Sequence, residues 1–590
     1  MRTKTFEPLL RRLGRLVKNE QVILTILSAL IGVAGGACAI AFREILTLAQ
    51  TVLLGFGSES VYSLATGLPW WHILAATVGG GLIVGLLVHF LIPGRRLHSV
   101  AEVIEASTLR RGRIDLRTGL VSAVASAISL GAGASTGREG PVVHFGATLS
   151  AFAAEKLKLG RSLAHTLLGC GVAAAVAASF NAPIAGVFFA LEVVIGHYAL
   201  KAFAPIVIAS VGGTIVSRIY FGDFPAFVLP PNQIVSFFEF PAFALLGLVG
   251  AVLAIVFMRA VAFTQETVQR SRIPLWAQPA CGGLLVGLIA LKFPHVLGVG
   301  YEATNHALHE QFELILLISL LVAKTVATVI SLGFNFGCGV FSPSLFLGAM
   351  LGGAFGIIAT HAFPDLSSGY DAYTIVGMGV VAGAVLGAPI STILMIFELT
   401  GNYEITIAVM IGTVIASLVT QQVFGHSFFT WQLACRGLDL KHGRSQNLLR
   451  SVYVSAVMKS DHNAVSPSAL MIEVRDALQK SRYGEIFVVD EEGRLHGTIT
   501  LPDLSDAAFD TELDAVINAE DVARLNPPIL TPDDTLDDAM SVMDAVDEEH
   551  IAVVENKTDM ILVGFVHKLD VVTAYNQAVL EARAEEQSVV

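Results

Sequence analysis

Two glycine-rich stretches that run into a proline carry the residue types needed to bind an anion. The first reads GREGP at 137–141, and the second ends in GVFSP at 339–343. Glycine followed by proline in the first turn is typical of the start of a helix. The first turn presents unpaired N–H groups and about half a positive charge. Two such helix starts that meet in an apolar interior would hold a small anion with backbone dipoles alone.

The two stretches belong to an internal repeat. Residues 127–149 and 329–351 align without gaps and coincide at nine of 23 positions, at an offset of 202. Further along the chain, the sequence Ala-Pro-Ile occurs at 182–184 and again at 388–390, an offset of 206 between Pro183 and Pro389. Matches in this order and spacing predict a duplication. A duplicated transport domain with interrupted helices places its site where the repeats meet, near the middle of the membrane.

The segments that contain these motifs are apolar enough to cross a membrane, but they are broken in the middle. Residues 162–191 and 325–364 contain no Asp, Glu, Lys or Arg, and about 20 apolar residues suffice for one crossing. The first run is interrupted by Asn-Ala-Pro at 181–183 and the second by the glycine-rich stretch at 333–343. Opened backbone at membrane depth is tolerated only where protein or water covers it. We therefore expect short helices that begin or end inside the membrane.

Charge divides the chain into two parts. Residues 436–590 hold 13 of the 37 Lys and Arg and 29 of the 49 Asp and Glu, whereas residues 1–435 hold 24 and 20. The first part is expected to be a multi-pass integral membrane domain of the plasma or inner membrane, and the second an acidic soluble domain. Basic residues precede the first apolar run, 21–42, and follow the last one, so both termini are expected in the cytoplasm. The lack of a basic face argues against nucleic-acid binding.

At the two helix starts the sequence resembles the CLC family of chloride channels and chloride/proton exchangers. GREGP at 137–141 and GxFxP at 339–343 match paired family motifs, and the resemblance covers about residues 20–435. It implies an α-helical polytopic fold of inverted repeats, a homodimer in the lipid bilayer with one pore per subunit, and chloride as the transported ligand. It also implies that Glu139 is the gate, because its carboxylate would compete with the anion for the helix ends. By the same match, the backbone N–H groups that face the anion belong to Gly140, Val340 and Phe341.

Three positions depart from the family pattern. The usual anion-site serine falls on His98, with Ser99 one residue along, and the usual inner tyrosine falls on Phe429. The inner glutamate through which exchangers take up protons falls on Val193, which carries no proton. We therefore expect passive chloride conduction gated by Glu139. Proton-coupled exchange is the alternative, with another group such as His98 carrying the protons.

The acidic tail resembles a pair of CBS domains. Short β segments, a polar turn and an acidic residue at a helix start recur at 450–510 and 520–580. Paired CBS domains often bind adenine nucleotides, and the aspartates that contact the ribose match Asp503 and Asp570, with Thr500 in the threonine position of the first copy. The alternative role for both aspartates is helix N-capping. The resemblance implies regulation by this pair and no cofactor that transport requires.

The predicted organisation is a cytoplasmic amphipathic segment at 1–20, a transport domain at 21–435, a linker at 436–449, the two CBS domains and a tail at 581–590.

A CBS-regulated cation transporter is a rival function, but it needs converging carboxylates or carbonyls in the membrane. An enzyme is the second rival. The glycines at 131–137 lack the βαβ context and the ribose-binding acid of a dinucleotide loop, so we expect no enzymatic activity.

Overall fold

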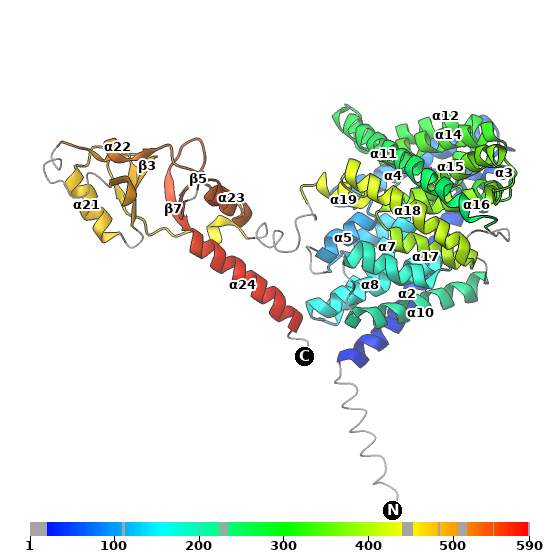
Figure 1. Ribbon diagram of the computed structural model, residues 1–590, viewed down its shortest axis with the longest axis horizontal. Coiled ribbons are helices and arrows are strands. Elements are labelled where there is room, and N and C mark those ends of the chain that lie inside the picture. The colour runs from blue at the N-terminus through cyan, green and yellow to red at the C-terminus, as the bar shows by residue number, and fades with distance from the viewer. Residues whose placement is uncertain are drawn as a thin grey trace, which may run out of the picture. The chain divides into compact units, whose positions relative to one another are not determined.

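The computed structural model describes residues 20–108, 112–196, 198, 200–223, 227, 234–438, 452–481, 484–504, 516–546 and 548–587. The chain divides into two compact units, Met1–Leu438 and Asp439–Val590, the first helical and the second of mixed α and β structure (Figure 1). Apart from Glu20, the predicted N-terminal segment lies outside the described residues, as do most of the predicted linker and the last three residues of the predicted tail.

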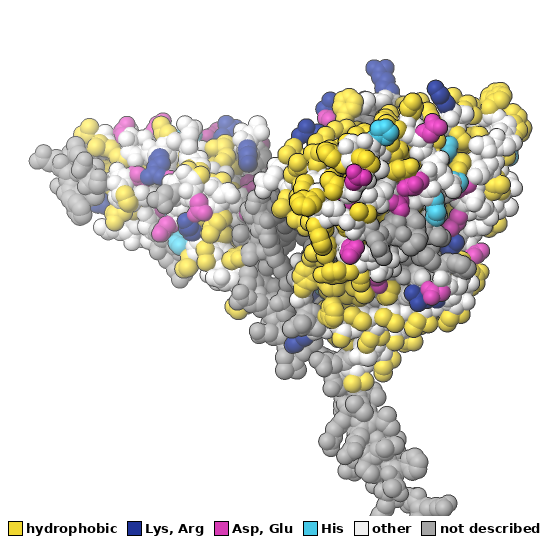
Figure 2. Space-filling view, turned by 45° about the vertical axis from the view of Figure 1, so that its right-hand side comes forward, with side chains coloured by type: hydrophobic (Ala, Val, Ile, Leu, Met, Phe, Trp, Pro, Cys, Tyr) yellow, Lys and Arg dark blue, Asp and Glu magenta, His cyan; other side chains and the backbone are white. Residues whose placement is uncertain are grey.

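The first unit is a bundle of long and short helices. Eight helical segments of the described chain are long and apolar enough to span a membrane. Figure 2 shows hydrophobic side chains in a broad band over the visible face of this unit. The helical polytopic fold predicted from the sequence is confirmed. Its α-helices are α2 (Glu20–Leu54), α3 (Val61–Ala65), α4 (Trp70–Leu91), α5 (Val100–Thr108), α6 (Leu116–Gly131), α7 (Glu139–Lys156), α8 (Arg161–Phe180), α9 (Pro183–Phe189), α10 (Leu200–Phe221), α11 (Phe240–Arg270), α12 (Gln278–Lys292), α13 (Tyr301–Leu308), α14 (Leu314–Gly333), α15 (Phe341–Ala362), α16 (Tyr370–Leu386), α17 (Pro389–Thr400), α18 (Tyr403–Val423) and α19 (Phe428–Ala434).

The helices break where the sequence predicts it. Helix α8 ends because Asn181 takes a left-handed conformation with φ 59°, and Pro183 then starts α9. In the second repeat, Gly387 takes the same conformation with φ 65° and Pro389 starts α17. Asparagine and glycine tolerate this conformation better than other residues. The two breaks are therefore produced by the same local chemistry.

The repeats meet first at two glycines. The Gly137 N–H donates to the Gly339 carbonyl over 2.8 Å, and these residues are related by the 202-residue offset. A methyl group on Gly339 would lie 1.9 Å from the Gly137 carbonyl oxygen. Only glycine permits this approach, which brings the loops before α7 and α15 into direct contact.

The repeats meet again through two exchanged helix caps. The Glu398 carboxylate, near the end of α17, accepts hydrogen bonds from Ile184 N and Ala185 N at the start of α9, both over 2.8 Å. Glu192 lies in the π-helical turn η1 (Ala190–Ile195) that follows α9, and it accepts from Ser391 N at the start of α17 over 2.8 Å. Each half thus supplies a carboxylate to a helix start of the other, where it is favoured by the helix dipole.

The second unit contains two small sheets, each with helices packed against it. The four-stranded sheet has the order β1-β2-β3-β4 and the three-stranded sheet the order β5-β6-β7. Each has a parallel pair followed by an antiparallel one, β1–β2–β3 in the first and β5–β6–β7 in the second, so this part of the unit is also duplicated. The strands are β1 (Ala464–Val465), β2 (Glu485–Val489), β3 (Leu495–Thr500), β4 (Arg524–Leu525), β5 (Ile529–Leu530), β6 (His550–Val554) and β7 (Leu562–His567), and the helices are α21 (Met471–Lys480), α22 (Ala519–Val522), α23 (Leu536–Val546) and α24 (Lys568–Gln587).

Candidate anion site

Helices α7 and α15 begin against each other. A methyl group on Gly140, in the first turn of α7, would lie 3.5 Å from the Gly339 Cα atom. Val340 and Phe341, which begin α15, follow Gly339 directly, and both are buried. Because N–H groups in a first turn have no acceptor within their own helix, two sets of unpaired donors converge here. The structure therefore brings Gly140, Val340 and Phe341 together, as the sequence predicts.

A third helix start contributes a hydroxyl to the same place. Ser99 directly precedes α5 and is buried, and a methyl group on Gly140 would lie 2.4 Å from its Oγ atom. This Oγ has no hydrogen-bond partner among the described residues. A buried hydroxyl without a partner is costly. A ligand between Ser99 and the first turns of α7 and α15 would supply one.

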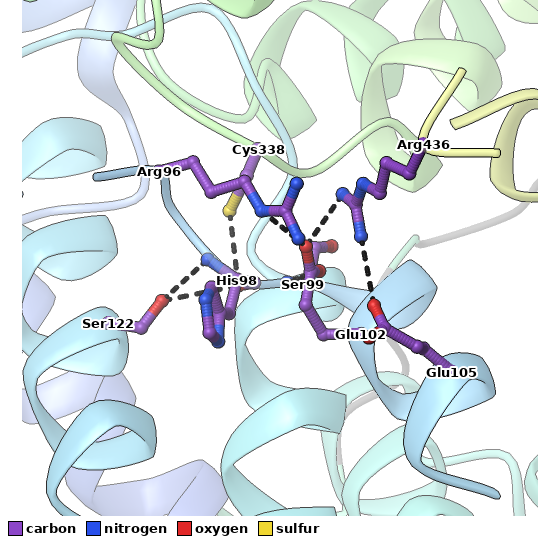
Figure 3. A network of polar contacts seen from close by, with 8 residues as sticks. All are labelled: Arg96, His98, Ser99, Glu102, Glu105, Ser122, Cys338 and Arg436. Atoms are coloured by element: carbon purple, nitrogen blue, oxygen red, sulfur yellow. Dashed lines mark hydrogen bonds and ion pairs between the residues drawn. The ribbon is translucent and has the colours of Figure 1, made fainter. Parts of the chain in front are cut away.

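The neighbouring His98 points its ring elsewhere. The ring packs edge to face against that of His144 on α7, with centroids 5.2 Å apart. Its backbone N–H donates to Ser122 Oγ over 2.8 Å, as Figure 3 shows. The sequence predicts both His98 and Ser99 at the candidate anion site. The structure puts the hydroxyl of Ser99, and not the imidazole of His98, beside Gly140.

The start of α5 is fixed by a buried ion-pair network (Figure 3). Glu102 accepts a hydrogen bond from Ser99 N over 2.7 Å, which caps the helix. Its other oxygen lies 2.7 Å from Arg436, whose second terminal nitrogen reaches Glu105 at 3.5 Å. Arg96 adds a longer contact of 3.6 Å to Glu102. Charge-assisted bonds of this kind orient groups firmly, so Arg436 positions the helix that carries Ser99.

Phe429 and Val193 lie on elements that also pack against α5. Phe429 is buried in α19, where its ring contacts that of Phe428 with centroids 6.2 Å apart. Val193 is partly buried in η1, next to Glu192. Neither side chain can exchange a proton, so this part of the site contributes no ionisable group at the two positions.

Glu139 is buried at the start of α7, and its carboxylate is held by a residue that the sequence did not single out. The Tyr301 hydroxyl donates to Glu139 Oε1 over 2.6 Å. Arg138 lies farther away, with Nε 3.8 Å from the same oxygen, and it pairs with Glu59 at 2.8 Å. The alternative role for Glu139, a structural ion pair with Arg138, is therefore the weaker interaction here. Tyr301 is 162 positions from Glu139, and no motif marks it.

In the second unit, the two aspartates expected at a nucleotide are engaged by side chains of the chain itself. Asp503 accepts from Thr500 N and Thr500 Oγ1 over 2.8 and 2.7 Å, and it pairs with Arg524 at 3.0 Å. Burial would raise the pKa of Asp503, but the bonds from Thr500 and Arg524 outweigh it and lower the pKa. Asp570 pairs with Lys459 at 2.7 Å. Both carboxylates are thus already neutralised.

Duplicated and interrupted helices whose starts converge on a buried hydroxyl define a polytopic membrane protein with a candidate site for a small anion. Comparison with known proteins makes this more specific. The profile described as voltage gated chloride channel matches residues 80–421, and the CBS domain profile matches 454–510 and 519–577. The chain belongs to the voltage gated chloride channel family. Its members are transporters and channels, not enzymes.

Individual relatives agree with this assignment. The chain is 32% identical over 418 residues to a ClcB-like chloride channel protein of Ralstonia nicotianae, which covers 69% of this chain and 96% of that protein. It is 28% identical to chloride channel protein CLC-f of Arabidopsis thaliana over 82% of this chain and 69% of that one. Among solved structures, a slow cyanobacterial Cl−/H+ antiporter superposes with a TM-score of 0.63 at 21% identity, over 71% of this chain and 99% of that chain. At that identity the likeness shows the fold alone.

Proposed function

We propose that this protein conducts chloride passively across the membrane along a path past Ser99 and the starts of α7 and α15, and that Glu139 gates the path. One observation carries the proposal. A buried carboxylate, a buried hydroxyl without a partner and two converging helix starts lie within one small region. Helix dipoles attract an anion without a full positive charge, so the ion can also leave.

The role of Glu139 follows from charge. A carboxylate buried in a membrane segment is costly and is usually functional. While it is ionised at the start of α7, it repels chloride from the same N–H groups. Protonation removes that repulsion and weakens its attachment to the helix start. The gate is therefore expected to open when Glu139 is protonated or leaves its position.

The test is chloride flux and reversal potential in liposomes and planar membranes that contain the full-length protein. We expect the reversal potential to follow the chloride gradient and to ignore a proton gradient imposed at fixed chloride. Glu139→Gln should keep chloride flux but remove its dependence on pH. Unchanged pH dependence in that variant would exclude Glu139 as the gate, and flux of magnesium in place of chloride would support the cation-transporter alternative.

Proton-coupled exchange is the second candidate, and one observation favours it. His144 is buried beside His98, and its Nε2 atom has no hydrogen-bond partner within the described part of the chain. Imidazoles transfer protons readily, so this pair offers an ionisable group although Val193 does not. If the pair carries protons, the reversal potential shifts with the proton gradient, and His144→Gln abolishes that shift while chloride flux remains.

For the second unit we propose binding of an adenine nucleotide that regulates transport. A cavity of about 140 Å³ lies between the two sheets, and its lining includes Phe487 and Phe565, whose ring centroids are 5.9 Å apart. It is smaller than the roughly 300 Å³ of a typical ligand pocket, so the cavity must widen to take a whole nucleotide. Calorimetric titration with ATP tests this, and Asp503→Ala and Asp570→Ala should each weaken binding. No heat of binding with the wild-type protein would refute it.

We also propose a homodimer with both termini in the cytoplasm. The supporting feature is membership of the voltage gated chloride channel family. Cross-linking in liposomes tests the dimer, and a protease added outside sealed vesicles tests the orientation. A chain that stays monomeric in lipid, or a second unit that is digested in right-side-out vesicles, would contradict the respective part.

A further inference from the structure

We propose that Tyr301 is the latch of the gate: its hydroxyl holds the Glu139 carboxylate in the position that blocks the anion path. The inference rests on the proposed gating role of Glu139 and adds the residue that sets how firmly the gate is closed. Tyr301 begins α13, outside the two motif-bearing loops.

The contact itself is short and buried. The hydroxyl donates to Glu139 Oε1 over 2.6 Å, and both side chains are buried, with relative exposures of 6% for Tyr301 and 1% for Glu139. A hydrogen bond from a hydroxyl to a carboxylate at such a distance is about twice as strong as a neutral one. Glu139 Oε2 has no hydrogen-bond partner among the described residues. The Tyr301 hydroxyl is therefore the closest polar contact of this carboxylate that the structure describes.

The tyrosine ring is held in place by two neighbouring side chains. The Arg138 guanidinium lies over the ring, 4.7 Å from its centroid, and Phe227 packs edge to face at 4.9 Å. Arg138 is itself tied to Glu59 at 2.8 Å. A ring clamped on two sides loses little further freedom when its hydroxyl bonds to Glu139, so more of the bond energy goes into holding the gate.

The turn that precedes Tyr301 in the chain is fixed by a buried lysine. Lys324 Nζ donates to the carbonyls of Val296 and Gly298 over 3.0 and 2.8 Å. Gly300, between this turn and Tyr301, has a φ of 91°, and a methyl group there would lie 2.7 Å from the Phe346 ring. The backbone that carries Tyr301 is thus anchored by Lys324, which no other part of the proposed mechanism uses.

The latch can also release, because its hydroxyl has a second partner. The Ser342 hydroxyl, in the first turn of α15, donates to the Tyr301 oxygen over 3.4 Å. When Glu139 leaves, the Tyr301 proton can turn to Ser342, so the hydroxyl is not left buried and unpaired. The tyrosine therefore links the gate on α7 to the start of α15 and favours the closed position without preventing opening.

The experiment is chloride efflux from liposomes that contain the full-length protein at fixed lipid composition, pH and chloride gradient. Tyr301→Phe removes one oxygen and keeps the ring, and efflux should rise about five- to tenfold. Ser342→Ala should act in the opposite direction, since the released hydroxyl then has no second partner.

Two further variants separate the latch from general loosening of the fold. On the Glu139→Gln background, Tyr301→Phe should change efflux by less than twofold, because the charged acceptor is already absent. Tyr373→Phe removes the hydroxyl of another buried tyrosine, one that bonds Glu239, and should leave efflux unchanged. Equal increases on both backgrounds, or none in Tyr301→Phe alone, would overturn the latch.

The outcomes also distinguish this inference from the proposed function. If Glu139→Gln removes the pH dependence and Tyr301→Phe has no effect, the gate stands and the latch is refuted. If Glu139→Gln leaves the pH dependence intact, the gate and the latch are both refuted.

Discussion

The Gly137 N–H donates to the Gly339 carbonyl over 2.8 Å, and these two residues occupy equivalent places in the two repeats. The bond holds the loops before α7 and α15 at a distance that only glycine allows. The geometry of the candidate anion site therefore depends on a backbone contact between the repeats, and the side chains are placed around it.

This contact gives the first prediction. Gly339→Ala should destabilise the helical unit by about 2 kcal/mol and reduce chloride flux at least about tenfold, because the helix starts are pushed apart. Flux assays and thermal unfolding in detergent measure both effects. Gly79→Ala in α4 is the matched control, since a methyl group there meets nothing within 4 Å. It should be neutral or slightly stabilising, and an equal loss in both variants would contradict the argument.

The second prediction concerns the hydroxyl beside Gly140. Ser99→Ala should lower the apparent affinity for chloride about fivefold, because one hydrogen bond to the ion is lost. Stability should not fall, since Ser99 Oγ has no partner in the described chain to lose. Chloride titration by calorimetry measures the affinity. His98→Gln should leave it within about twofold of the wild type, because the His98 ring faces His144. A larger effect of His98→Gln than of Ser99→Ala would reverse the assignment.

The third prediction concerns the base of α5. Arg436→Ala removes the 2.7 Å ion pair of buried Glu102 and leaves this carboxylate with the Ser99 N–H and the longer contact to Arg96. Removing one partner of a buried pair costs about 3 kcal/mol. We expect a lower unfolding temperature and weaker chloride binding together, because the same helix carries Ser99. Arg436→Lys keeps the charge but cannot reach Glu102 and Glu105 at once. Its unfolding temperature and chloride affinity should therefore lie between those of the wild type and those of Arg436→Ala. Wild-type stability in Arg436→Ala would contradict this role.

The fourth prediction concerns pH and the second unit. Burial, with repulsion from Glu548, raises the pKa of Glu485 to about 8, and burial lowers the pKa of the adjoining His550 to about 4. The two side chains lie 3.2 Å apart. Above about pH 6.5 the glutamate of the unfolded chain has lost its proton and the histidine is losing the last of its own, whereas folded Glu485 keeps its proton. Stability should therefore fall by about 1.5 kcal/mol between pH 6.5 and 8.

Hydrogen exchange of the β2 and β6 amides in the full-length protein measures this slope. Glu485→Gln cannot lose a proton, so its exchange protection should stay level over the same range. Between about pH 4.5 and 6.5 the His550 effect has the opposite sign, because the unfolded histidine binds the proton that the folded one rejects. The wild-type slope should accordingly be shallower there. A wild-type slope that survives in Glu485→Gln would assign it to another group.

The sequence predicts those parts of the fold that depend on local chemistry. Pro183 and Pro389 stand in the first turn of α9 and α17, a position that proline favours, and the apolar runs specify membrane helices by length. The matching offsets of 202 and 206 predict the duplication that the exchanged caps of Glu192 and Glu398 display. The convergence of Gly140 with Phe341 follows from the motifs together with the repeat.

The rest depends on contacts between distant residues. Tyr301 and Lys324 are ordinary residues in ordinary segments, and their roles arise from partners brought near by folding. His98 and Ser99 differ by a single position, and only the direction in which α5 begins decides which one reaches the anion site. Glu485 carries no sequence signal either, since its proton affinity is set by burial in the second unit.

The exchanged caps have a consequence for the origin and the integrity of the helical unit. Because Ile184 and Ala185 correspond to Ile390 and Ser391, the bonding pattern is unchanged when the two halves trade places. Such reciprocity does not require a covalent connection, and two separate copies of one half-length ancestor would satisfy it equally well. In the present chain both halves belong to one polypeptide, and each half supplies the carboxylate that caps a helix start of the other.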